Sequence, residues 1–160
     1  MEIKQHSSLD NLLHEIEHAV ECLYNKGNIA ERSCKSAINL TKNETKASEK
    51  VMRINHMGEI CAQGLYRGQA AHTKDQKLKK KLHNICNEEN EHLKLCNLRL
   101  KELNGHSSVL NPLWYLSSYI LGSIAGIKEN DWKLGFIEET EKQVTEHLKE
   151  SIKQLPEKDT

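Results

Sequence analysis

Residues 87–103, NEENEHLKLCNLRLKEL, carry an acid and an imidazole on what is otherwise the apolar face of a helix. At about 100° per residue, Glu89 and His92 lie about 60° apart and share one face. The same face carries the apolar residues Leu82, Ile85, Leu93, Cys96, Leu100 and Leu103. A charge inside a core is costly unless it is paired or bound to a metal. The stretch therefore predicts a long helix in which Glu89 points inward because it has a functional role.

Two further acids, Glu59 and Glu141, also stand where a helix would normally place an apolar side chain. Glu59 shares its face with Met52, Ala62, Tyr66 and Ala70, and Glu141 shares its face with Leu134, Ile137, Val144, Leu148, Ile152 and Leu155. Each acid taken alone also fits a salt bridge at the edge of the core. Together with a Glu-x-x-His step, three such acids on three helices favour a metal pair in a helical bundle. Oxygen-rich sites with a few imidazoles suit iron or manganese. The candidate metal ligands are Glu59, Glu89, His92 and Glu141.

The composition bounds the class of protein. A chain of 160 residues fits one domain, here 1–160, and 23 basic against 23 acidic side chains leave no net field that favours nucleic acid. The start of the chain has no apolar region typical of a signal peptide. The 5 cysteines are odd in number and form no C-x-x-C pair, which indicates free thiols in a reducing compartment. Cys96, one turn after His92, fits a buried structural thiol better than a zinc ligand.

The hydrophobic period predicts an all-α protein without strand-like alternation. An amphipathic helix at 8–23 precedes a polar linker at 24–48, and the bundle occupies 49–160. Within the bundle, Asn104-Gly105 is a stop signal and Asp131 is a candidate N-cap. The expected helices after the linker are 49–71, 75–103, one within the uncharged stretch 109–127, and 131–155.

The uncharged stretch 109–127 has three readings. Its length permits a membrane span, but Pro112 starts the helix late and leaves about 15 residues, short of the roughly 20 that a span needs. Burial between subunits is the second reading. Trp114 and Tyr115 near one end favour the third, insertion into the lipid interface. Gly122-x-x-x-Gly126 is a weak signal for close helix packing.

A competing motif, HEIEH, stands at residues 14–18. The pattern H-E-x-x-H is typical of zinc peptidases, with Glu15 as base and His14 and His18 as ligands. On a helical wheel, both histidines lie opposite the apolar stripe of Leu9, Leu12, Leu13, Ile16 and Val20, so the first helix would turn them toward solvent. A solvated polar face is therefore the expected reading of this motif.

The stretch VMRINHMGEICAQGLYRGQA (51–70) resembles the demethoxyubiquinone hydroxylase family of ubiquinone biosynthesis. That family carries an Arg-x-Asn-His-x-Gly-Glu motif, matched here by Arg53, Asn55, His56, Gly58 and Glu59. The resemblance continues through 87–103, through LNPLWYLSSYILGSIAGI (110–127) and through WKLGFIEETEKQVTEHL (132–148). SLDNLLHEIEHAV (8–20) is similar to the family's first helix.

The resemblance implies a ferritin-like antiparallel bundle that binds two iron ions and hydroxylates the ring of a demethoxyubiquinol with O2. Glu59 and His92 would bind one iron, Glu89 would bridge, and Glu141 would belong to the second iron. The family's last Glu and His come from a Glu-Asp-Glu-x-x-His-type segment that this sequence lacks. A second unit opened by Glu141 with the 30-residue spacing of Glu59 and Glu89 would place that step near residue 171, beyond Thr160. We therefore expect the C-terminal site helix to be missing.

The partners implied are a prenylated quinol, O2 and a membrane surface contacted through 109–127, with room for a homo-oligomer. The implied location is the cytoplasmic face of a membrane. The alternative functions are a catalytically incomplete, membrane-associated quinone-binding remnant of this enzyme, and the zinc peptidase of His14, Glu15 and His18.

Overall fold

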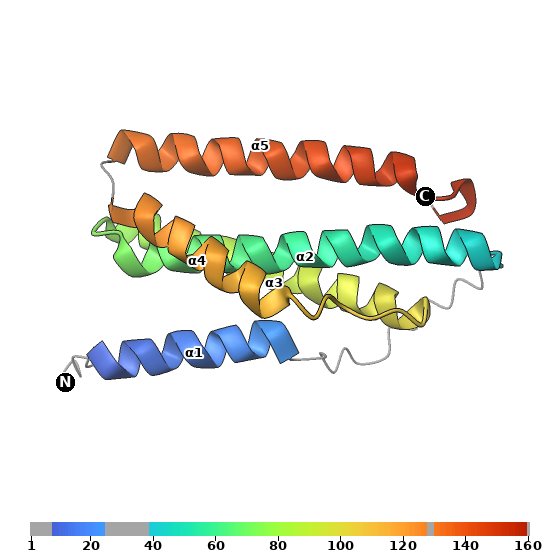
Figure 1. The fold of residues 1–160 in the computed structure, drawn as a ribbon. Coiled ribbons are helices and arrows are strands. Elements are labelled where there is room, and N and C mark those ends of the chain that lie inside the picture. The colour runs from blue at the N-terminus through green and yellow to red at the C-terminus, as the bar shows by residue number, and fades with distance from the viewer. Residues whose placement is uncertain (1–7, 25–38, 128–129, 160) are drawn as a thin grey trace.

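A computed structural model of the chain describes residues 8–24, 39–127 and 130–159, and every long regular element in these ranges is a helix (Figure 1). This confirms the all-α bundle predicted from the hydrophobic period. The elements are α1 (Ser8–Tyr24), α2 (Lys42–His72), α3 (Gln76–Glu102), α4 (Asn111–Ile127), α5 (Asn130–Gln154) and a short 3₁₀ helix η1 (Glu157–Asp159).

The ends of α2 and α3 are set by side-chain caps. Thr41 accepts a hydrogen bond from the Glu44 amide, and Glu44 accepts one from the Thr41 amide, so a complete capping box starts α2. The helix therefore begins at Lys42, inside the expected linker, and residues 25–38 of that linker lie outside the described part. Asp75 caps α3 through the amides of Lys77 and Leu78. After α3, Asn104 takes a positive φ of 54°, as the stop signal predicts.

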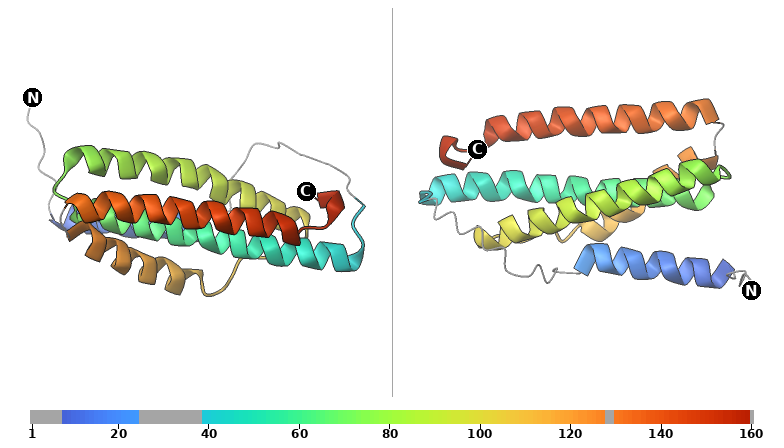
Figure 2. Two further views of the ribbon diagram at one scale, coloured as in Figure 1. Left: turned by 90° about the horizontal axis from the view of Figure 1, so that it is seen from above. Right: turned by 180° about the vertical axis from the view of Figure 1, so that it is seen from behind.

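The helices are arranged around α2. Seen from above, α3 and α4 lie on either side of α2, while α5 and α1 lie on its two remaining sides (Figures 1 and 2). The most extensive helix contacts are those of α2 with α4 and with α3. None of the helices in the described ranges combines the length and the apolar character needed to cross a bilayer.

Glycines allow α2 and α4 to pack closely. A Cβ atom added at Gly122 would lie 1.9 Å from the Leu65 carbonyl oxygen, and one added at Gly68 would lie 2.1 Å from the Tyr119 carbonyl oxygen. Neither backbone can accept a side chain at these points without separating the helices. The Gly122-x-x-x-Gly126 signal is thus used for close packing, here between two helices of one chain.

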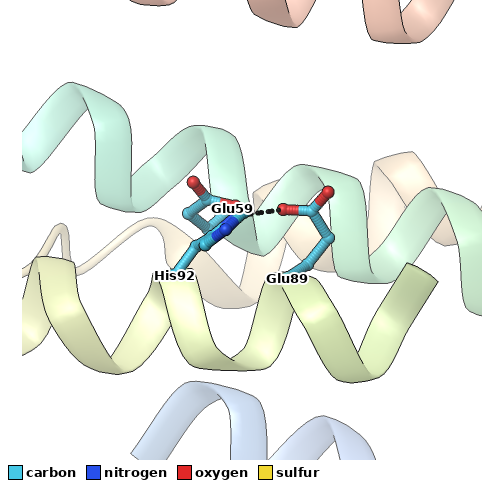
Figure 3. A group of neighbouring side chains, drawn as sticks. All are labelled: Glu59, Glu89 and His92. Atoms are coloured by element: carbon cyan, nitrogen blue, oxygen red, sulfur yellow. Dashed lines mark hydrogen bonds and ion pairs between the residues drawn. The ribbon is translucent and has the colours of Figure 1, made fainter. Parts of the chain in front are cut away.

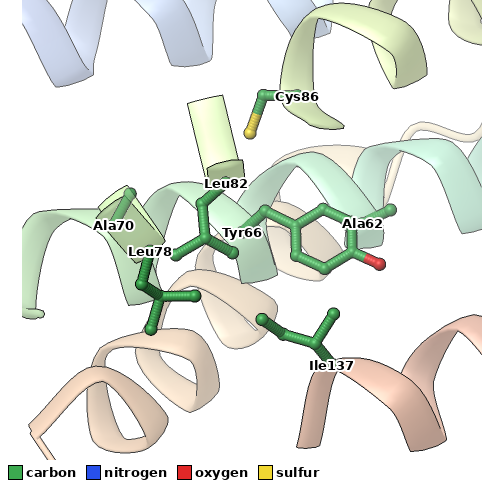
Figure 4. Close-up of a cluster of buried hydrophobic side chains, with 7 residues drawn as sticks. All are labelled: Ala62, Tyr66, Ala70, Leu78, Leu82, Cys86 and Ile137. Carbon is green, nitrogen blue, oxygen red and sulfur yellow. The ribbon is translucent and has the colours of Figure 1, made fainter. Parts of the chain in front are cut away.

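The main apolar cluster joins α2, α3 and α5 (Figure 4). Tyr66 and Leu82 are fully enclosed at its centre, and Ile137 is the contribution of α5. The cluster consists of Ala62, Tyr66, Ala70, Leu78, Leu82, Cys86 and Ile137. The face of α3 predicted to be apolar is therefore the face that packs.

Helix α1 docks with its polar face inward, opposite to the expected orientation. Its apolar side chains Leu9, Leu13, Ile16 and Val20 are exposed. Glu15 instead forms a two-point ion pair with Arg67 of α2, at 2.8 and 3.1 Å, and His18 Nε2 lies 3.2 Å from Gln63 Oε1. Arg67 is buried, and a buried guanidinium is costly without a counter-charge. The polar face of α1 supplies that counter-charge, and Cys22 near the end of the helix packs with Ile60 of α2 in a second buried cluster.

Helix α5 is only partly covered. Ile137 packs into the core, but Leu148 and Ile152, expected on the same buried stripe, are exposed. Its C-terminal end is tied down by polar contacts, since Ser151 donates a hydrogen bond to Asn55 and Arg99 pairs with Asp159 of η1. The side chains of Asp131 and Leu134 lie outside the described residues.

Candidate metal centre

Glu59 of α2 and Glu89 and His92 of α3 converge between the two helices (Figure 3). One potential ligand atom from each side chain lies within 4.8 Å of the other two. Ile60, next to Glu59, is fully buried, and Leu93, next to His92, is almost so, which fixes how both helices are rotated. The structure thus brings together three of the four side chains singled out from the sequence.

The Glu-x-x-His step is hydrogen-bonded within α3. His92 Nδ1 lies 3.1 Å from Glu89 Oε2, and this contact is drawn as the dashed line in Figure 3. The Glu89 side chain is largely buried, whereas the His92 side chain is 57% exposed. The sequence predicted an imidazole inside the apolar stripe; the structure places it at the edge. Its Nε2 atom remains available for a ligand.

The site has an excess of negative charge. Burial, and then the hydrogen bond and charge of the neighbouring Glu89, raise the pKa of Glu59 from its ordinary value to about 8. Two carboxylates that face each other in a partly dry environment cannot both ionise easily without a cation. A divalent metal ion would supply that charge, so the donor set fits one chemically.

Glu141 of α5 is linked to α2 by a hydrogen bond with Tyr66. The Tyr66 hydroxyl donates a hydrogen bond to Glu141 Oε1 at 2.5 Å, although Glu141 does not belong to the group of three. The Tyr66 side chain is almost completely buried. Burial and the nearby carboxylates of Glu141 and Glu89 raise the pKa of Tyr66, so its hydroxyl stays protonated and available as a donor. The sequence indicated Tyr66 only as an apolar neighbour of Glu59, because a tyrosine's hydrogen-bond partner on another helix leaves no local pattern.

The motif residues before Glu59 position the flanking segments. His56 is buried and lies 3.3 Å from the side chain of Asn111 at the start of α4. Arg53 donates a hydrogen bond to the backbone carbonyl of His106 in the loop between α3 and α4. Asn55 accepts the hydrogen bond from Ser151. Beyond supplying Glu59, the motif therefore connects α2 to three other segments.

The HEIEH motif does not form a second metal site. Within residues 8–24, 39–127 and 130–159, the group of Glu59, Glu89 and His92 alone meets the distance requirement for three ligands. Glu15 is engaged by Arg67, His14 is exposed, and His18 is partly buried against Gln63. The expectation that both histidines face solvent is right for His14 and wrong for His18.

Comparison with known proteins gives consistent matches over almost the entire chain. The model of the family described as "Ubiquinone biosynthesis protein COQ7" matches residues 46–160. A Xanthomonas oryzae pv. oryzae (strain PXO99A) protein named 3-demethoxyubiquinol 3-hydroxylase is 46% identical over 159 residues, which cover 96% of this chain and 72% of that protein. A protein of the same name from Psychrobacter arcticus is 42% identical, covering 99% of this chain and 76% of its own length. No solved structure gives a significant match.

Proposed function

This chain belongs to the family of the ubiquinone biosynthesis protein COQ7, and on that premise we propose that it hydroxylates the ring of a demethoxyubiquinol at a pair of iron ions. Its relatives in three bacterial genera carry the name 3-demethoxyubiquinol 3-hydroxylase. The observation in the structure that supports the proposal is the convergence of Glu59, Glu89 and His92 from two helices.

Glu59, Glu89, His92 and Glu141 would hold the metal. Burial and the neighbouring Glu89 carboxylate raise the pKa of Glu59, and a divalent pair would neutralise the negative charge that these two carboxylates carry when ionised. By the family resemblance, Glu59 and His92 would hold one ion, Glu141 would hold the other, and Glu89 would be shared by both. Oxygen and imidazole donors suit iron. Iron, when bound, supplies the redox chemistry by which one oxygen atom of O2 is inserted into a ring C–H bond.

The chain's own residues set the geometry around such a centre. The Glu89 carboxylate contacts His92 Nδ1, which orients the imidazole ring and leaves Nε2 without this partner. The Tyr66 hydroxyl occupies one oxygen of Glu141 and leaves the other for a metal. The apolar side chains that surround Tyr66 in the main cluster exclude water from the side of the site that Tyr66 borders.

We also propose that the protein contacts the cytoplasmic face of a membrane through residues 109–127. The stretch has no charged side chain, and its exposed apolar residues are Val109, Leu110, Leu113, Trp114, Leu116, Ile120, Leu121, Ile124 and Ile127. An apolar surface of this kind marks a contact with lipid or another protein. Leu116→Glu with Ile120→Glu should abolish cosedimentation with phospholipid vesicles. Leu95→Glu, at an exposed apolar residue of α3, is the control that should leave vesicle binding unchanged.

The hydroxylation is tested by metal content and by isotope transfer. Protein loaded anaerobically with Fe(II) should retain iron, and with ¹⁸O2, a reductant and short-tail demethoxyubiquinol it should yield a ring-hydroxylated product carrying ¹⁸O. Glu89→Gln should lose both properties, whereas Glu88→Gln, at the exposed neighbouring position, should keep both. Quinol binding without iron retention or product in the unmodified chain would favour the quinone-binding remnant instead.

A further inference from the structure

A pocket of about 670 Å³ opens between the C-terminal ends of α1 and α3 and the start of α4. Its walls differ in character. Tyr24, Val109 and Pro112 contribute apolar surface, while Asn97, Lys101 and Asn111 contribute polar groups. None of its described lining residues is acidic. The pocket is therefore suited to a molecule that is polar at one end and apolar at the other.

Asn111 supplies an unsatisfied polar group to this pocket. Its side chain is buried, with 3% of the residue exposed, and its Nδ2 atom lies 3.3 Å from His56 Nδ1. The Oδ1 atom has no hydrogen-bond partner. If the amide is turned around, Nδ2 becomes the unpaired atom, so one polar end stays unmatched in either orientation. A buried polar atom without a partner is costly, and a ligand hydroxyl could satisfy either end because it both donates and accepts.

The pocket's polar end is in contact with the two helices that carry the metal ligands. His56, which contacts Asn111, precedes Glu59 by about one turn of α2, and its side chain is also hydrogen-bonded to Asn97. Asn97 follows His92 by five residues of α3, about 7.5 Å along the helix axis. His56 and Asn97 thus link the polar end of the pocket to the two helices that carry the metal ligands.

The mouth of the pocket faces the surface that we propose to contact lipid. Val109, which lines the pocket, is 87% exposed, and the neighbouring Leu110 and Leu113 are exposed as well. A hydrophobic tail leaving the pocket at this point would pass directly onto apolar surface. An apolar tail attached to a hydroxylated ring matches both ends of the pocket.

We propose that this pocket receives the quinol ring of the lipid substrate, with a ring hydroxyl hydrogen-bonded to the Asn111 amide and the prenyl tail passing over Val109. The proposal rests on the proposed function and adds the place at which the substrate enters. The side-chain amide of Asn111 acts as the recognition group, and it is separate from the metal ligands.

The test is anaerobic equilibrium dialysis of the full, metal-free chain against the quinol of ubiquinone bearing one isoprene unit. Asn111→Leu removes the amide at similar volume and should weaken binding about tenfold, the effect of one lost hydrogen bond to a buried group. Gln69→Leu is the matched control, because Gln69 is fully buried, both of its amide atoms are unpaired, and it does not line the pocket. Its quinol affinity should equal that of the unmodified chain.

A second variant covers the case in which Asn111→Leu disturbs the start of α4. Ser107→Trp, in the loop that lines the pocket, fills the space without removing a buried contact, and it should abolish quinol binding. Unchanged affinity in Asn111→Leu and Ser107→Trp, equal loss in Gln69→Leu, or binding of inorganic phosphate in place of the quinol would overturn the inference. Because the dialysis needs no metal, such a result leaves the iron content and ¹⁸O transfer to decide the proposed function separately.

Discussion

Replacing Glu59 by glutamine should change the way in which the stability of the metal-free protein depends on pH. Burial and the adjacent Glu89 raise the pKa of Glu59 to about 8 in the folded chain, against 4.5 for an ordinary glutamate. The folded state therefore binds a proton that the unfolded state has already lost between these two values. Stability contributed by protonated Glu59 is present below pH 4.5 and is lost as the pH rises toward 8.

The size of the loss follows from the shift. One pKa unit corresponds to about 1.4 kcal/mol, so the full shift from 4.5 to about 8 would amount to about 5 kcal/mol. Water reaches part of the Glu59 side chain, and this screening brings the expected loss to about 2–3 kcal/mol. Glutamine cannot ionise, so Glu59→Gln should match the unmodified protein near pH 4.5 and exceed its stability by about 2–3 kcal/mol at pH 8.5.

Urea unfolding at a series of pH values, in the presence of a chelator, measures this difference directly. Glu88→Gln is the control, since Glu88 is exposed and its replacement should give a difference that does not vary with pH. A constant stability difference between Glu59→Gln and the unmodified chain from pH 4.5 to 8.5 would refute the reasoning. With Co(II) at saturation the trend for the unmodified protein should reverse, because the metal binds the deprotonated carboxylate.

Three further predictions concern the centre and its frame. Tyr66→Phe removes the hydrogen bond to Glu141 and should lower the affinity for Co(II) about 10- to 100-fold, as measured by titration of the visible spectrum. Tyr115→Phe removes a buried hydroxyl that has no partner, and it should leave the Co(II) affinity unchanged. Gly122→Ala forces a Cβ atom to 1.9 Å from a carbonyl oxygen of α2 and should lower the free energy of unfolding by at least about 1–3 kcal/mol. Gly135→Ala places its Cβ atom in open space on α5 and should raise the free energy of unfolding by about 0.5–1 kcal/mol. Leu82→Ala, at a fully buried position, should cost about 2–5 kcal/mol in urea unfolding, and a loss below 1 kcal/mol would contradict the assignment of this cluster as the core.

Most of the helix layout could be predicted from the sequence because it depends on local patterns. The 3.6-residue period of apolar side chains located every long helix, and the Asn104-Gly105 signal matched the observed end of α3. The start of α2 was placed several residues too late, although Thr41-x-x-Glu44 is a capping-box pattern that could have located it. For the site, Glu59, Glu89 and His92 could be singled out as candidates, and their proximity expected, because charged residues interrupt an apolar stripe at helical spacing.

The orientation of α1 shows where such patterns stop being sufficient. An apolar stripe normally identifies the buried face of a helix. Here Arg67 is buried on α2, and Glu15 lies 52 positions before it in the sequence. A local period cannot reveal that a charge on another helix needs a partner, and a buried charge left without one is costly.

The sequence by itself determined the helices, the family and the identity of the metal-binding candidates, because each of these is encoded in residue types at short spacing. The tertiary structure alone decided which atoms meet: the Tyr66 hydroxyl with Glu141, Glu15 with Arg67, and Asn111 with His56 at the edge of a pocket. These contacts join residues 52 to 75 positions apart. They depend on how helices rotate against one another to satisfy every buried polar group at once, which is a property of the packed bundle and of no single segment.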